Sequence, residues 1–310
     1  MINLYRLEKI GASPISLPDM SSLDAITRQL PDGYYSTFRT YDGCTRVLGL
    51  KSHLRRLFDP VTAPEVTASE LRQELLSLLE PFRPDEARVR VMITKQGKVY
   101  VAMEPLKLLP TEFYENGVHV ETTEIQRNNP RLKSTLFIGE SASERMHIAQ
   151  EGIFEALLVK NGRILEGMTS NFFYVINTHA ERNDEWFPRR ADEARIGNIH
   201  GASSAEPQTA FGSSAQRDVL FTAQRDVLLG VTRKTVIQLA RSRGVEVKYR
   251  PLKLSQLSQV KEAFITSSSR GVVPIIQIDE ATIGQGRPGQ ITRMLITAYN
   301  EYVLEHAEKI

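Results

Sequence analysis

The 310-residue chain contains a single cysteine, Cys44, and its 39 basic residues nearly balance 37 acidic ones. One cysteine excludes a disulfide framework and any metal site built from several cysteines. A net charge of +2 gives no strong electrostatic footprint for nucleic acid or an acidic membrane surface. No stretch approaches the roughly 20 apolar residues of a membrane-spanning helix, and the first 20 residues lack the pattern of a secretory signal. We therefore expect a cytoplasmic enzyme or a soluble binding protein, with no nucleic-acid or membrane partner.

The composition is that of an ordinary globular protein, with 41% apolar and 25% charged residues. Hydrophobic periodicity and turn residues predict a mixed α/β (α+β) fold. Helices are expected at residues 52–57, 67–79, 141–150, 232–243 and 291–306. Strands are expected at residues 34–41, 87–93, 98–103, 118–122, 155–159, 163–165, 171–176, 245–249, 263–267 and 272–278.

The chain is long enough for two domains. The polar stretch 127–131 predicts a boundary that leaves a smaller N-terminal domain, 1–124, and a larger C-terminal domain, 125–310. Residues 178–216 are polar, lack any sustained period and hold the only tryptophan, Trp186. We expect an inserted, mobile surface excursion there. A short duplication follows, because the sequence of residues 215–220 returns at 223–228.

Several simple chemistries find little support in the sequence. None of the six histidines has metal-ligand spacing to another histidine or to Cys44, so no metal site is expected. The run that begins at Gly284 matches a dinucleotide-binding pattern, but no second strand follows it and a plain turn is favoured. Two single residues are more notable. Glu166 is an acid between two apolar strands, where a carboxylate needs a partner. A lysine such as Lys133 becomes a nucleophile for carbonyl groups when its pKa is lowered.

Five motifs then appear in order along the chain. They are His53-Leu54-Arg55-Arg56-Leu57; Arg131-Leu132-Lys133-Ser134; Glu155-Ala156-Leu157-Leu158 with Glu166-Gly167-Met168-Thr169-Ser170-Asn171; Leu229-Gly230-Val231-Thr232-Arg233; and the stretch 264–274 with 283–289. Together they resemble the class IV aminotransferases, a pyridoxal-phosphate family of branched-chain aminotransferases, D-amino-acid transaminases and aminodeoxychorismate lyases. The resemblance covers nearly the whole chain except residues 178–216.

The resemblance implies the two-domain fold type IV, with pyridoxal 5'-phosphate between the domains. Lys133 would be the catalytic residue and bind the cofactor covalently, and Glu166 would pair with the pyridine nitrogen. The phosphate would be held by Arg56, by the region of Val231 and Thr232, and by Ser268. Ser170 and Asn171 would support the site. These residue types suit the chemistry, because a helix N-terminus and an arginine favour phosphate and a buried carboxylate keeps a ring nitrogen protonated.

The substrate is less well defined by the sequence. The residues after Lys133 lack the tyrosine of branched-chain enzymes, and the turn 168–171 is nearer to the D-amino-acid branch. Arg90 and Arg39, on N-terminal strands, are candidates for binding the substrate carboxylate. The expected activity is amino transfer between an amino acid, branched-chain-like or D-, and a 2-oxo acid, in a homodimer. Two alternatives stay open: an aminodeoxychorismate lyase that releases pyruvate, and a non-catalytic binding protein on the same fold.

Overall fold

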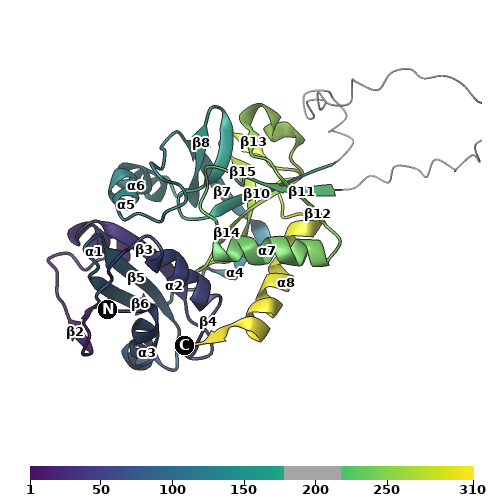
Figure 1. Ribbon diagram of the computed structural model, residues 1–310. Coiled ribbons are helices and arrows are strands. Elements are labelled where there is room, and N and C mark those ends of the chain that lie inside the picture. Colours follow the sequence, from purple (N-terminus) through teal and green to yellow (C-terminus); the bar gives the residue numbers. More distant parts are fainter. Residues whose placement is uncertain (178–217) are drawn as a thin grey trace, which may run out of the picture.

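The computed structural model describes residues 1–177 and 218–310, and the excursion expected at 178–216 lies outside these residues. Two β-sheets organise the described part of the chain (Figure 1). The five-stranded sheet comes first in the sequence and the ten-stranded sheet follows. Helices α2 and α7 lie between the two sheets. The mixed α/β class predicted from the sequence is confirmed.

The first sheet has the strand order β2-β1-β6-β5-β3, and all of its pairings are antiparallel. The elements of this part of the chain are β1 (Asn3–Leu7), β2 (Ala12–Pro14), α1 (Leu23–Gln29), β3 (Gly33–Arg39), β4 (Arg46–Val47), α2 (Leu50–Phe58), α3 (Ala68–Leu79), β5 (Ala87–Thr94) and β6 (Val99–Pro105). Strand β4 lies outside the five-stranded sheet. The strands predicted at residues 87–93 and 98–103 are confirmed, and they pair as the antiparallel hairpin β5–β6, with Gly97 in its turn. Helix α3 begins where the sequence predicts, because Thr67 and Glu70 form a capping box.

The second sheet has ten strands and closes part of itself into a ring. Its elements and neighbouring helices are α4 (Thr111–Asn116), β7 (Val118–Thr123), α5 (Leu136–Glu140), α6 (Ala142–Gln150), β8 (Glu155–Lys160), β9 (Arg163–Gly167), β10 (Asn171–Asn177), β11 (Asp218–Thr222), α7 (Val231–Ser242), β12 (Glu246–Tyr249), β13 (Leu252–Lys253), β14 (Glu262–Ser267), β15 (Gly271–Ile278), β16 (Ala281–Thr282) and α8 (Gln290–His306). Strand β10 pairs with β14 and also with β9, where Asn171 lies opposite Glu166. The ring therefore closes at two residues that the sequence assigns to the site.

The two sheets are joined by main-chain hydrogen bonds as well as by packing. The Tyr35 N–H donates to the Lys133 carbonyl at 2.9 Å, and the Thr135 N–H donates to the Gly33 carbonyl at 3.0 Å. The Thr135 hydroxyl also accepts from the Gly33 N–H at 2.9 Å. The segment that carries Lys133 is thus attached to the outer edge of β3, the last strand of the first sheet.

The change of sheets does not coincide with the expected domain boundary at residues 124/125. The first sheet ends with β6 at Pro105, and β7, which begins at Val118, pairs with β8 and β15 of the second sheet. At the C-terminus, β17 (Glu308–Lys309) returns to pair with β4. One strand from the first 124 residues, β7, therefore belongs to the second sheet, and one strand from the end of the chain, β17, pairs within the first part.

Helices α2 and α7 meet closely between the sheets. Gly49, the N-cap of α2, has a φ of +66°, and a Cβ there would lie 2.5 Å from Val231 Cγ1. Only glycine combines that backbone conformation with such a close approach. The contact brings the start of α7 beside the helix that carries Arg56.

The sequence analysis missed several elements, among them β1, α1 and β11. The two copies of the duplicated Asp-Val-Leu sequence differ in structure: Asp218–Leu220 lies in β11, whereas residues 226–228 form an irregular turn with Asp226 at a φ of +56°. No helix of the described residues is long and apolar enough to span a membrane.

We expect Thr135→Val to weaken the attachment of the Lys133 segment to β3. The substitution keeps the shape of the side chain but leaves the buried Gly33 N–H without the hydroxyl as acceptor. An unsatisfied buried donor costs roughly 1–3 kcal/mol of the free energy of unfolding. Urea denaturation checks this against Thr111→Val, an exposed position, and equal stability of the two variants would contradict it.

Candidate active site

A cavity of about 620 Å³ opens between the two sheets. It is lined from both sides: by β3, α2 and β5 of the first sheet, and by the segment around Lys133, the β9–β10 turn, the start of α7 and the turn after β14. Nine of the ten site residues expected from the sequence line this one cavity, namely Arg56, Arg90, Lys133, Glu166, Ser170, Asn171, Val231, Thr232 and Ser268. Arg39 is not among the lining residues.

Lys133 presents its amine to the cavity from the seam between the sheets. Its Nζ lies 4.7 Å from the centre of the Tyr35 ring. The residue as a whole is half-buried because it borders the open cavity, whereas dense protein surrounds the amine on the other sides. Burial, and then the positive charges of Arg56, Arg90 and Arg127, hold the pKa of Lys133 well below its ordinary value. The lowered pKa increases the fraction of the neutral amine, which is the nucleophilic form.

Glu166, the last residue but one of β9, lies on the cavity wall, and both of its carboxylate oxygens have partners. Oε1 lies 3.0 Å from Arg127 Nε, and Oε2 accepts from the Leu228 N–H at 2.9 Å and from Asn171 Nδ2 at 3.2 Å. Burial raises the pKa of Glu166 to about 7, although Arg127 and the Leu228 N–H favour the ionised form. An additional positive group in the cavity would shift this carboxyl toward its ionised form.

Arg56, Ser268 and the N-terminus of α7 all line the cavity and have the chemistry that favours an anion; we refer to them as the anion site. Gly230, Val231 and Thr232 line the cavity at the start of this twelve-residue helix, and no side chain caps it. Its free backbone N–H groups and the helix dipole favour negative charge. A Cβ at Gly230 would lie 2.4 Å from Asn171 Oδ1, so glycine lets the helix start close to the β9–β10 turn.

Some buried polar atoms of the cavity wall have no hydrogen-bond partner among the described residues. Three are Arg56 Nε, Ser170 Oγ and Thr266 Oγ1, which all belong to lining residues. Buried polar groups are normally paired, and each exception needs an explanation. Two hydroxyls and a guanidinium nitrogen without partners, all on residues that line one cavity, suit a ligand with several hydrogen-bond acceptors.

The two arginines expected to bind the substrate carboxylate differ in placement. The Arg39 guanidinium lies 4.6 Å from the centre of the Tyr41 ring, away from the cavity lining. Arg90 lines the cavity but is largely buried, and its Nη1 contacts Asp24 Oδ1 at 2.6 Å while its Nε donates to Thr37 at 3.1 Å. Asp24 also contacts Arg145 at 3.2 Å, so two arginines share one carboxylate.

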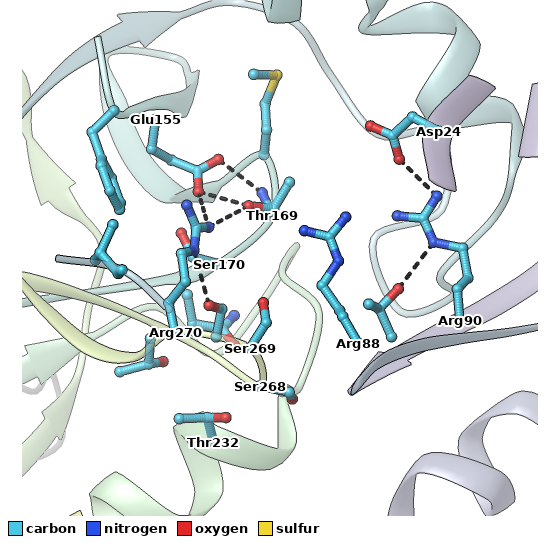
Figure 2. A pocket seen from close by; sticks show the side chains of 18 of the residues that line it. Asp24, Arg88, Arg90, Glu155, Thr169, Ser170, Thr232, Ser268, Ser269 and Arg270 are labelled. Carbon is cyan, nitrogen blue, oxygen red and sulfur yellow. Dashed lines mark hydrogen bonds and ion pairs between the residues drawn. The ribbon is translucent and has the colours of Figure 1, made fainter. Parts of the chain in front are cut away.

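Arg88 and Arg127 are cavity residues that the sequence analysis did not single out. Figure 2 shows Arg88 between Arg90 and the turn that carries Thr169 and Ser170. Its Nε lies 2.8 Å from Glu104. Arg127 was assigned only to a polar boundary segment, yet it is buried against Glu166 and stacks at 4.0 Å over Phe137. Alternation along β5 could have paired Arg88 with Arg90, but nothing local marks Arg127 as buried.

A second ion pair holds the β9–β10 turn from the opposite side. Glu155 accepts from the Thr169 N–H at 3.0 Å and from Arg270 Nη2 at 2.7 Å (Figure 2). Arg270 also donates to the Thr169 hydroxyl. These bonds fix the turn that positions Ser170. In residues 1–177 and 218–310, no group of three or more His, Cys, Asp or Glu side chains is arranged to hold a metal ion.

Comparison with known proteins agrees with this architecture. The family model described as "Amino-transferase class IV" matches residues 33–278. A Methanocaldococcus jannaschii protein assigned provisionally as a branched-chain-amino-acid aminotransferase is 26% identical over 85% of this chain and 84% of its own length. The D-alanine aminotransferase of Bacillus licheniformis is 24% identical over 91% of each chain.

Solved structures share the fold over nearly the full length. A Thermotoga maritima protein, assigned provisionally as a branched-chain amino acid aminotransferase, superimposes with a TM-score of 0.70 at 22% identity, over 98% of this chain and 96% of the other. An aminotransferase from Brucella abortus bound to pyridoxal phosphate gives 0.66 at 19% identity, over 97% and 99%. The chain belongs to the class IV aminotransferase family, a family of transaminases.

The buried carboxyl predicts a pH dependence of the cofactor-free protein. Because folding raises the pKa of Glu166 from its ordinary 4.5 to about 7, the folded state holds this proton more tightly than the unfolded state. Its contribution to the free energy of unfolding must therefore fall as the pH rises from 4.5 to 7, and stay low above 7. The loss is on the order of 3 kcal/mol.

Glu166→Gln cannot ionise and supplies the comparison. We expect the stability difference between the wild type and this variant to shift toward the variant between pH 5 and pH 8, measured by urea unfolding. Any constant effect on Arg127 cancels in that shift. A difference that stays constant across this range would show that Glu166 is already ionised at pH 5.

Proposed function

We propose that this protein is a pyridoxal-phosphate-dependent aminotransferase that moves an amino group between an amino acid and a 2-oxo acid. One observation carries the proposal. A buried amine with a lowered pKa, a buried carboxyl held by Arg127, and an anion site with Arg56 and a helix N-terminus all line one cavity. The relatives that bind pyridoxal phosphate share this fold.

The cavity suits the cofactor in charge and in hydrogen bonding. Lys133 would bind it covalently, Glu166 would face its ring nitrogen, and Arg56, Val231, Thr232 and Ser268 would hold its phosphate. The unpaired Ser170 Oγ and Thr266 Oγ1 would gain acceptors. When bound, pyridoxal phosphate supplies an electron sink for negative charge at the substrate α-carbon.

The chain's own residues would then perform three tasks. Lys133 Nζ, whose lowered pKa favours the neutral form, can attack a carbonyl and later accept and return a proton. Arg127 and the Leu228 N–H favour the ionised form of Glu166, which keeps a facing ring nitrogen protonated. Asn171, which bonds both Glu166 Oε2 and the Leu228 carbonyl, fixes the orientation of that carboxylate.

Arginines on the first sheet suit the binding of the substrate carboxylate. Burial opposes ionisation of Asp24, yet Arg90 and Arg145 hold the pKa of this shared carboxyl below its ordinary value. Two guanidiniums on one carboxylate leave one positive charge in excess. We therefore assign the binding of the substrate carboxylate to Arg90 and its neighbour Arg88. Arg39 is less suited to this role because it does not line the cavity.

The substrate side chain is the finer part of the proposal. Both branched-chain and D-alanine aminotransferases are among the relatives, at similar identities, so a branched-chain-like amino acid and a D-amino acid are both candidates. Release of pyruvate from aminodeoxychorismate is the alternative reaction for the same lysine. A homodimer in the cytoplasm is the proposed form, on the resemblance to the family.

Lys133→Ala should abolish turnover while the protein still folds. The variant loses the only group proposed to bind the cofactor covalently, whereas Lys51→Ala, an exposed position on α2, should keep the wild-type rate. The assay is a panel of L- and D-amino acids with 2-oxoglutarate and pyruvate, run beside aminodeoxychorismate. Appreciable transamination by folded Lys133→Ala would overturn the assignment, and activity on aminodeoxychorismate alone would favour the lyase.

Arg88→Leu should raise KM for the amino acid and for the 2-oxo acid without releasing the cofactor. A lost charge-assisted hydrogen bond lowers kcat/KM by roughly ten- to hundredfold. Arg88→Lys keeps the charge and should lose less, and Arg28→Leu, exposed on α1, serves as control. Unchanged KM values for Arg88→Leu would remove Arg88 from substrate binding.

A further inference from the structure

His53 is a polar residue in the apolar stripe of α2. The helix buries Leu50, His53, Leu54 and Leu57, which follow helical spacing, and His53 is completely buried. A buried polar ring is costly unless its nitrogens have partners. Nδ1 lies 2.8 Å from Ser36 Oγ, and Nε2 lies 3.4 Å from Ser268 Oγ.

The direction of these hydrogen bonds is set by Arg56. Its Nη2 donates to Ser36 Oγ at 3.1 Å, and a guanidinium cannot accept. Ser36 therefore uses an oxygen lone pair toward Arg56 and has its own hydrogen left for another partner. His53 Nδ1, at 2.8 Å, is the acceptor in reach.

The tautomer of His53 follows from the same logic. Burial, and then the positive charge of Arg56, lower the pKa of His53 well below its ordinary value, which favours the neutral ring. A neutral imidazole carries one hydrogen. Because Nδ1 accepts from Ser36, Nε2 must carry that hydrogen and donate to Ser268 Oγ.

Because Ser268 Oγ accepts from His53, the hydroxyl hydrogen of Ser268 is available to a ligand. It lines the cavity together with Arg56, whereas His53 lies behind the wall. Ser36 is on β3 and His53 on α2, beside the first sheet, and Ser268 follows β14 of the second. The chain of hydrogen bonds therefore crosses the seam between the sheets at the anion site.

We propose that His53 is a positioning residue of the anion site. As the neutral Nε2–H tautomer, it accepts from the Ser36 hydroxyl, which accepts from Arg56, and it donates to Ser268 Oγ. The Ser268 hydroxyl hydrogen is therefore free to donate to a phosphate monoester in the cavity. The assignment rests on the proposed function, which puts the cofactor phosphate beside Arg56 and Ser268. It goes beyond that function because it places the ring hydrogen of His53, which does not line the cavity, on Nε2.

The tautomer can be observed directly in the full-length wild-type protein. With ¹⁵N-labelled histidine and pyridoxamine phosphate bound, NMR should show His53 Nδ1 as unprotonated and Nε2 as protonated. This pattern should persist from pH 6 to pH 9. A protonated Nδ1, or an imidazolium within this range, would overturn the proposal whatever the behaviour of any variant.

A double-mutant cycle tests the consequence for the ligand. Affinities for pyridoxamine phosphate and for pyridoxamine, which lacks the phosphate, are measured by fluorescence titration. His53→Phe and Ser268→Ala should each weaken binding of the phosphorylated ligand about tenfold, the worth of one hydrogen bond to a charged group. Both variants should bind pyridoxamine within about twofold of the wild type. The double variant should also lose about tenfold, since the two residues act through one bond.

Matched variants separate this role from packing. His53→Gln keeps an N–H near the position of Nε2 and should recover most of the affinity, and His147→Phe, on the surface of α6, should change nothing. A hundredfold loss in the double variant, or equal weakening of both ligands by His53→Phe, would overturn the proposal. If the wild type itself binds both ligands equally, the phosphate site of the proposed function fails, and this role of His53 with it.

Discussion

The cavity depends on a short main-chain attachment at the edge of β3. Residues 133–135 bond to Gly33 and Tyr35 and so hold an ionisable amine in the seam between two sheets, within reach of several arginines. An amine in that place gives up its proton because the charged form is both desolvated and repelled. The same seam opens the cavity, brings Arg56 beside α7 and places Glu166 on the opposite wall. The attachment therefore helps to hold groups from the two sheets around one cavity.

The charges of the cavity follow from what each element can supply. Strand β5 and helix α2 contribute arginines from the first sheet, and the second sheet contributes Glu166, Glu155 and a helix N-terminus. The two buried carboxylates of the cavity wall each have a guanidinium partner: Arg127 for Glu166 and Arg270 for Glu155. The remaining positive potential, at Arg56 and around Asp24, lies where a phosphate and a carboxylate would bind in the proposed function.

Local pattern predicted much of this structure and long-range contact decided the rest. Helix α3 and the hairpin β5–β6 could be predicted because capping, period and turn residues agree. The order of the motifs was enough to assign Lys133, Glu166 and Arg56 to one site, and the three residues line one cavity. The contacts of Arg127 and His53 could not be predicted, since their partners are 39 and 215 residues away. The duplicated Asp-Val-Leu shows the limit most plainly, because identical triplets form a strand in one place and a turn beside Glu166 in the other.

In the proposed function, the Lys133 amine is the reactive group of the cavity. The direct measurement is to incubate the wild-type protein with pyridoxal phosphate at neutral pH, reduce it with borohydride, digest it and map the added mass by tandem mass spectrometry. We expect one phosphopyridoxyl group per chain, on Lys133. A label spread over surface lysines, or absent from the peptide that contains Lys133, would contradict it.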